Sequence, residues 1–272
     1  MIISFKEKFI FVKPRKLAGT SIEVALSSIC GNDDIITPVS PVDELQRIDL
    51  MHCRNYDDDK QAEAEYIAQL KMIKKFPDLD VKLRDIETPE GTYFNHMSLK
   101  RACALIKQDI SDFTVIFPVR DPYATIISLA SWRIANKEGI FKRTWPVKNS
   151  DKATKKYLNK NIDACIKTVR DNFELCSGYK AHKHVILRYE NLQDDFNGLL
   201  KAMGYPPITL PHLKKSTRLS TDPGDFFYPK QINLVYDSLK EYFMSFGYQK
   251  PTGYKKISAS FFFPRIFGQI LG

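Results

Sequence analysis

The stretch from Phe9 to Leu26 reads FIFVKPRKLAGTSIEVAL and organises the rest of the chain. It opens with an unbroken apolar run, Phe9–Val12, which is typical of a strand buried on both faces. A basic turn follows, and Thr20 or Ser21 can cap the amphipathic helix that we expect next. The N–H groups and the positive dipole end of such a helix point into the turn. The stretch therefore predicts a cradle for an anion.

Two more apolar runs, 113–119 and 184–189, lie further along the chain, and each precedes a helical pattern. Pro122 suits the first turn of the helix that follows the earlier run. Strands that alternate with helices predict a parallel sheet with helices on its faces, and ligands bind at the carboxyl ends of such strands. We expect one α/β domain over residues 1–272 with a central, mostly parallel sheet, and helical insertions at about 40–90 and 135–180.

The net charge and the cysteine content indicate which class of partner and which cellular compartment to expect. The formal net charge of +9 predicts an anionic partner, but the basic residues are scattered and form no nucleic-acid-binding motif, so we do not expect nucleic acid. The five cysteines are odd in number and lack CxxC spacing, which favours free thiols in the cytoplasm over disulfides or a zinc site.

No apolar run is long enough to span a bilayer, and no signal peptide precedes the first strand. We expect the apolar stretch 261–268 to pack onto the body of the protein; contact with another subunit or with a membrane surface is the alternative.

The order Lys-x-Ala-Gly-Thr-Ser after a hydrophobic strand resembles the 5′-phosphosulfate loop of sulfotransferases that use 3′-phosphoadenosine 5′-phosphosulfate (PAPS). The likeness is closest to the carbohydrate and membrane-associated branch, although Arg15 replaces a proline of that pattern and Leu17 replaces a threonine. The loop is not a Walker A motif, in which lysine directly precedes the hydroxyl residue. An ordinary turn between strand and helix is the alternative interpretation.

The resemblance implies a P-loop-like fold and a cytoplasmic, microbial member of the family, because the chain begins almost at the loop. It also implies that the loop contacts the donor through Arg15, Lys16, Ala18, Gly19, Thr20 and Ser21.

Three later motifs extend the resemblance. Arg120 follows the second expected strand, with Ser128 two turns along the next helix, and resembles the 3′-phosphate element of the family. An arginine in this position can bind a phosphate through two hydrogen bonds, or it can merely pair with a carboxylate and organise the turn. Tyr189 is a candidate for contact with the adenine or a half-buried strand residue. Lys215 and Arg218 lie in a basic loop that either closes over the nucleotide or is simply solvated.

The function that the resemblance implies is transfer of a sulfuryl group from PAPS to a hydroxyl of a carbohydrate or glycolipid acceptor, with 3′-phosphoadenosine 5′-phosphate (PAP) as product. Lys16 is the candidate catalytic cation, and His96, expected at a helix start, is the candidate general base, with a capping or core histidine as the alternative. We expect no divalent metal. The alternatives are a P-loop-like kinase or nucleotide hydrolase and a non-catalytic nucleotide-binding protein.

Overall fold

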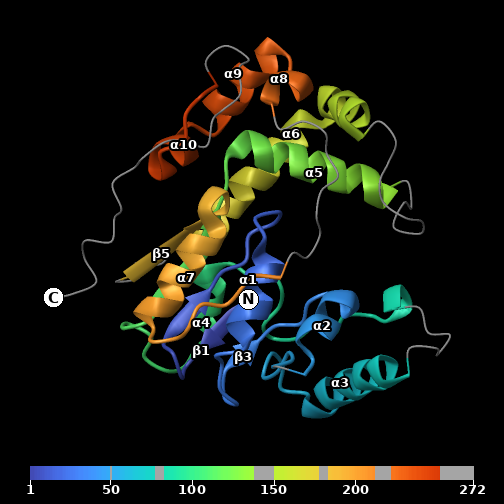
Figure 1. Ribbon diagram of the computed structural model, residues 1–272, viewed down its shortest axis with the longest axis vertical. Helices are drawn as coiled ribbons and strands as arrows, with labels where there is room; N and C mark the ends of the chain where they lie inside the picture. Colours follow the sequence, from blue (N-terminus) through green and yellow to red (C-terminus); the bar gives the residue numbers. More distant parts are fainter. Residues whose placement is uncertain (50, 77–82, 138–149, 178–182, 212–221, 252–272) are drawn as a thin grey trace.

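Five strands form one mixed sheet in the order β3-β1-β2-β4-β5. Figure 1 labels β1, β3 and β5 of this sheet. The strands are β1 (Ile2–Ser4), β2 (Phe9–Phe11), β3 (Ile35–Ile36), β4 (Thr114–Val119) and β5 (Lys183–Arg188). The inner part of the sheet is parallel, because β4 pairs in parallel with both β2 and β5. At the other side, β1 pairs antiparallel with β2 and β3. The sheet therefore has a parallel core with an antiparallel edge.

The computed structural model describes residues 1–49, 51–76, 83–137, 150–177, 183–211 and 222–251. Lys215, Arg218 and the apolar stretch 261–268, for which the sequence makes predictions, lie outside these residues.

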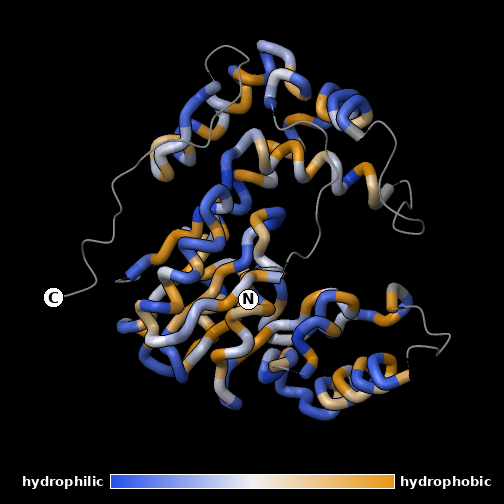
Figure 2. Tube along the Cα trace, in the orientation of Figure 1, coloured by the Kyte–Doolittle hydropathy of each residue, from blue (hydrophilic) through white to orange (hydrophobic). Residues whose placement is uncertain are grey.

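Helices cover both faces of the sheet. Successive residues of a strand point to opposite faces, so an apolar strand such as β2 contributes side chains to a core on each side. Phe9 and Phe11 of β2 pack with α1 (Gly19–Ser27) and α7 (Leu192–Ala202). Ile10, between them, faces the larger core on the other side. The helices that contribute to this larger core are α4 (Leu99–Leu105), α5 (Pro122–Lys137), α6 (Ser150–Cys176), α8 (Pro223–Phe226), α9 (Pro229–Ser238) and α10 (Lys240–Phe246). Figure 2 shows hydrophobic positions recurring along the helices with hydrophilic positions between them, as helices packed on one side require.

The two regions that the sequence suggests as insertions have different surroundings. α2 (Pro41–Arg47) and α3 (Lys60–Lys75) enclose a separate small cluster that includes Tyr66 and Leu70, to one side of the sheet (Figure 1). By contrast, α6 contributes Leu158, Ile166 and other residues to the main core. α6 is thus a structural helix of the main body, bent at Asn161, where the backbone leaves helical geometry.

The prediction of three parallel strands alternating with helices is confirmed, and the α/β class with it. The short strands β1 and β3 were not expected. The predicted cap is wrong: α1 begins at Gly19 after Ala18, so Thr20 and Ser21 lie inside the first turn. α9 and α10 are separated at Leu239, whose backbone is not helical.

Among the helices of the described residues, none combines the length and the apolar character needed to cross a bilayer.

Candidate functional site: the basic loop, Arg120 and an adjoining cavity

The basic loop, Lys13–Ala18, leads from β2 into α1 and has a constrained backbone. Lys16 and Ala18 adopt left-handed conformations, with φ of 67° and 57°, which non-glycine residues rarely do and which cluster at ligand sites. The N-cap residue of α1 is Ala18, whose methyl side chain cannot accept a hydrogen bond, so the first N–H groups of this helix have no partner within it. Lys16, Ala18 and Thr20 are partly exposed, whereas Ser21 is only 6% exposed. The loop and the helix end therefore offer backbone donors next to accessible cations.

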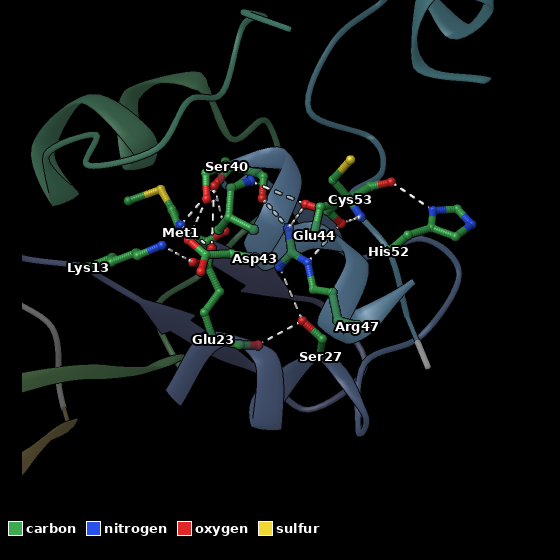
Figure 3. A network of polar contacts seen from close by, with 12 residues as sticks. Met1, Lys13, Glu23, Ser27, Ser40, Asp43, Glu44, Arg47, His52 and Cys53 are labelled. Carbon is green, nitrogen blue, oxygen red and sulfur yellow. Dashed lines mark hydrogen bonds and ion pairs between the residues drawn. The ribbon is translucent and has the colours of Figure 1, made fainter. Parts of the chain in front are cut away.

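Lys13, the first residue of the loop, forms an ion pair with a buried carboxylate of α1. Its Nζ lies 2.5 Å from Oε2 of Glu23, and both side chains are buried (Figure 3). Burial opposes ionisation of Glu23, but the positive charge of Lys13 and other nearby groups outweighs it and lowers the pKa of Glu23 to about 2. A Cβ on Gly19 would lie 2.6 Å from Cγ of Lys13, so glycine is required where the lysine crosses the helix start. Lys13 thus anchors the loop.

The buried ion pair continues into a polar network that reaches α2. Ser27 donates to the carbonyl of Glu23 and accepts a hydrogen bond from Arg47, which in turn pairs with Glu44 at 2.7 Å (Figure 3). Arg47 and Glu44 are both fully buried. Polar and charged contacts therefore fix the side of α1 that carries Glu23 and Ser27, and the first turn of α1 adjoins the loop.

Arg120 follows β4 and meets two of the other predicted motifs. Its Nη1 donates to the carbonyl oxygen of Lys16 at 3.3 Å, and its guanidinium carbon lies 3.8 Å from the ring centroid of Tyr189. The side chain is 7% exposed, and its Nε has no hydrogen-bond partner among the described residues. Burying a guanidinium donor without an acceptor costs free energy of folding, so the Nε–H of Arg120 is available to donate to a bound ligand.

Ser128 lies on α5, and the side chain of Lys16 contacts the same helix. Nζ of Lys16 lies 5.5 Å from the ring centroid of Trp132, which is within cation–π range. Ser128 is partly exposed and lies four residues before Trp132, so both are on one face of α5. Ser128 was predicted as a site residue from the sequence, and Trp132 was not.

His96 lies in a turn before α4, not at the helix start that was predicted, because α4 begins at Leu99 with Ser98 as its cap. Its Nδ1 lies 2.6 Å from the carbonyl oxygen of Lys13. A carbonyl oxygen only accepts hydrogen bonds, so Nδ1 carries the proton and Nε2 is the unprotonated nitrogen of the neutral ring. Burial and the charge of Lys13 lower the pKa of His96 to about 4, which keeps the ring neutral at pH 7.

A cavity of about 630 Å³ adjoins the loop between α4, α5 and α6. Arg15, His96 and Trp132 line it, so it borders the loop, the candidate base and the ring beneath Lys16. The rest of its lining mixes polar, charged and apolar side chains from the three helices and the residues next to their ends: Ser98, Lys100, Leu129, Arg133, Thr168, Asp171, Asn172, Glu174, Leu175 and Ser177. This size and mixture suit a small polar ligand.

Asp121 is the carboxylate that the kinase alternative would need at the end of β4. Its Oδ1 accepts the N–H of Ala124 at 2.8 Å and so caps α5, and its backbone N–H donates to Glu190. Burial raises the pKa of Asp121 to about 6. In the described residues, no three His, Cys, Asp or Glu side chains gather as a metal-binding group.

Two residues that support the backbone of the site were not predicted from the sequence: Asn172 of α6 and Tyr242 of α10. Asn172 bonds to the backbone of Arg15, 157 residues away, and Tyr242 to the backbone of Arg120, 122 residues away. No local pattern marks either residue, because each acts across the fold.

Comparison of the chain with protein-family models, with curated proteins and with solved structures gave no match.

Proposed function

We propose that this protein is a PAPS-dependent O-sulfotransferase that moves a sulfuryl group to a hydroxyl of a carbohydrate or glycolipid acceptor. The observation that carries the proposal is the convergence of Lys16, Arg120 and Tyr189, which three separate strand ends supply. The sequence resemblance assigns all three to the donor, and a single nucleotide bisphosphate needs them in one place.

The two anionic ends of the donor have separate partners in this arrangement. The 5′-phosphosulfate lies against the uncapped first turn of α1 and the Lys16 ammonium, where backbone N–H groups and the helix dipole favour negative charge. The 3′-phosphate is bound by the Ser128 hydroxyl and by Arg120, whose buried Nε has no hydrogen-bond partner within the described ranges of the chain. Tyr189, which already stacks on Arg120, lies where an adenine ring can extend the stack.

The chemistry is an in-line displacement at sulfur, in which positioning and charge stabilisation dominate, as in phosphoryl transfer. The acceptor oxygen forms a new bond to sulfur while the bond from sulfur to the bridging phosphate oxygen breaks. PAP leaves with the electron pair, and a base takes the hydroxyl proton. Lys16 stabilises the charge that develops on the leaving phosphate. Its contact with Trp132 holds the ammonium beside the cavity before the donor arrives.

His96 is the proposed base because it lines the cavity next to the loop. Its hydrogen bond to Lys13 fixes the tautomer that leaves Nε2 unprotonated. A pKa of about 4 makes His96 a weak base in the free protein. A bound donor adds several negative charges beside the loop and raises the pKa of His96, because a nearby anion favours the imidazolium.

The cavity is the proposed acceptor site. It borders His96 and the ring beneath Lys16, so a hydroxyl held in it lies beside both the base and the cation. Trp132, 38% exposed, offers an apolar platform, and Ser98, Thr168 and Glu174 offer hydrogen-bonding groups around it. One aromatic face within a polar rim suits a sugar ring better than an extended apolar chain. The proposed compartment is the cytoplasm, in keeping with five free cysteines.

Two measurements test this function against its alternatives. Calorimetry with PAP, and separately with ATP and Mg²⁺, decides between a sulfotransferase and a kinase or nucleotide hydrolase: micromolar binding of PAP with much weaker binding of ATP supports the proposal, and the reverse order contradicts it. Transfer of labelled sulfate from PAPS to a panel of glycans and glycolipids then separates the enzyme from a non-catalytic nucleotide-binding protein, which would bind PAP and transfer nothing.

A further inference from the structure

Asn172 holds the backbone of the basic loop with both ends of its amide. Its Oδ1 accepts the N–H of Arg15 at 2.8 Å, and its Nδ2 donates to the carbonyl of the same residue at 2.9 Å. This is the pairing that a neighbouring strand would make, supplied instead by one side chain of α6. Asn172 is only 3% exposed. Lys16, the next residue along, has the left-handed backbone that such an external clamp can maintain.

Tyr242 holds the second anion-binding turn in a corresponding way. Its hydroxyl contacts both the backbone N–H of Arg120 at 3.3 Å and the carbonyl of Arg120 at 3.1 Å. The tyrosine is 4% exposed. Its ring packs edge-on against Phe173, with centroids 5.8 Å apart, and Phe173 directly follows Asn172 on α6. Adjacent residues of one helix therefore support both turns, one directly and one through Tyr242.

We infer that Asn172 and Tyr242 are positioning residues of the proposed donor site, and that each one sets the affinity for one end of the nucleotide. The inference rests on the proposed function for the identity of the ligand. Neither side chain is proposed to contact the ligand, because each already hydrogen-bonds to backbone groups and both are buried. Loss of a buried hydrogen-bond partner leaves the backbone group unsatisfied and frees the turn to move.

The two roles predict different ligand signatures, measured with PAP and with adenosine 5′-phosphate, which lacks the 3′-phosphate. Asn172→Leu disturbs the loop that binds the 5′ end, so it should weaken both ligands by a similar factor, roughly tenfold or more. Tyr242→Phe disturbs the Arg120 turn, so it should weaken PAP by roughly tenfold and leave adenosine 5′-phosphate nearly unchanged. A role confined to general stability would weaken both ligands alike in both variants, and that result would overturn the inference, as would wild-type affinity in either variant.

Matched controls exist for both substitutions. Asn161→Leu removes another α6 asparagine, whose Nδ2 donates to the carbonyl of Tyr157 and not to the loop. Tyr123→Phe removes another buried hydroxyl, which donates to the carbonyl of Ile232 at 2.8 Å. Both controls should bind the two ligands as the wild type does. Where Asn172→Leu fails to fold, Asn172→Ser takes its place with the same expected pattern.

Hydrogen exchange keeps this inference separate from the proposed function. In the wild-type chain without nucleotide, the N–H of Arg15 is protected by Asn172. Exchange in the peptide 13–20 should rise at least tenfold in Asn172→Leu and stay unchanged in Asn161→Leu. If the wild type binds no PAP, the proposed function falls while this exchange result still decides the role of Asn172. If PAP binds and the exchange is unchanged, the positioning role is wrong and the function stands.

Discussion

The guanidinium of Arg120 donates to the backbone carbonyl of Lys16 at 3.3 Å, although the two residues are 104 positions apart. The contact joins the turn after β4 to the loop after β2 at one edge of the sheet. It places the Arg120 guanidinium against the backbone of Lys16, the residue that supplies the other cation of the proposed function. Nε of the same guanidinium is buried and finds no hydrogen-bond partner in the part of the chain that the structure describes, which is the unusual feature that a bound phosphate would explain.

Arg120→Ala is expected to weaken PAP roughly 10- to 100-fold, because a charge-assisted contact with the 3′-phosphate is lost. Binding of adenosine 5′-phosphate should change far less. Calorimetry with the two ligands measures the difference. The control is Arg101→Ala, since Arg101 also stacks on an aromatic ring, Phe94, but lies outside the site. Equal losses for both ligands in Arg120→Ala would show that this arginine only organises the turn.

Lys16→Ala is expected to lower the rate of sulfate transfer by about 10²–10³-fold, because the charge on the leaving phosphate loses its main stabiliser. Binding of PAP should fall less than the rate does, since the backbone donors of α1 remain. The rate is measured with labelled PAPS under single-turnover conditions. Lys155→Ala, which removes a similar cation–π contact with Tyr228, should leave transfer unchanged. Wild-type transfer by Lys16→Ala would rule out the catalytic role.

The low pKa of His96 predicts acid sensitivity of the fold. Its value of about 4 in the folded chain lies below the ordinary 6.5 that it regains on unfolding, so the unfolded chain takes up the proton first. Stability is therefore full above about pH 6.5 and falls as the pH drops towards 4, by about 3 kcal/mol at most. His96→Asn keeps a donor for Lys13, suits the φ of 63° and does not titrate.

Urea unfolding at several pH values checks this prediction. The stability of His96→Asn should change less than that of the wild type between pH 6.5 and 4. His52→Asn, which removes a histidine away from the loop, should follow the wild type. A wild-type slope in His96→Asn would mean that His96 is not the buried neutral group described here.

The buried pair of Lys13 and Glu23 is expected to behave as a unit. Glu23→Gln leaves the Lys13 ammonium buried without its carboxylate and should cost about 3–5 kcal/mol of unfolding free energy. The double change Lys13→Met with Glu23→Gln should cost less than the sum of the single changes, as a double-mutant cycle measures. Breaking the exposed pair of Lys8 and Asp112 should leave stability close to that of the wild type. Additive losses in the cycle would contradict a direct pairing.

Much of the framework around the site could be predicted from the sequence. The apolar runs that became β2, β4 and β5 each contain at least three consecutive apolar residues, and each precedes a helix that packs back on the sheet. Their parallel pairing places Lys16, Arg120 and Tyr189 at one edge, as predicted. β1 and β3 were missed because their apolar runs, Met1–Ile3 and Ile35–Ile36, are shorter than the four-residue run that marks β2.

The finer features of the site could not be predicted because they depend on distant contacts. The cap of α1 is a left-handed Ala18, a backbone choice that local preference disfavours and the surrounding fold imposes. His96 was predicted as a candidate base, but its hydrogen bond to Lys13 and its low pKa follow from burial against the loop. Asn172 and Tyr242 are an ordinary helical asparagine and tyrosine until the fold places them behind the two turns.

The most direct test of the account is the structure of the protein crystallised with PAP. We expect one PAP molecule with its 5′-phosphate at the first turn of α1 within hydrogen-bonding distance of Lys16. Its 3′-phosphate should contact Arg120 and Ser128. A PAP molecule bound elsewhere, or one whose 3′-phosphate does not meet Arg120, would contradict the claim that these two cations hold a single nucleotide.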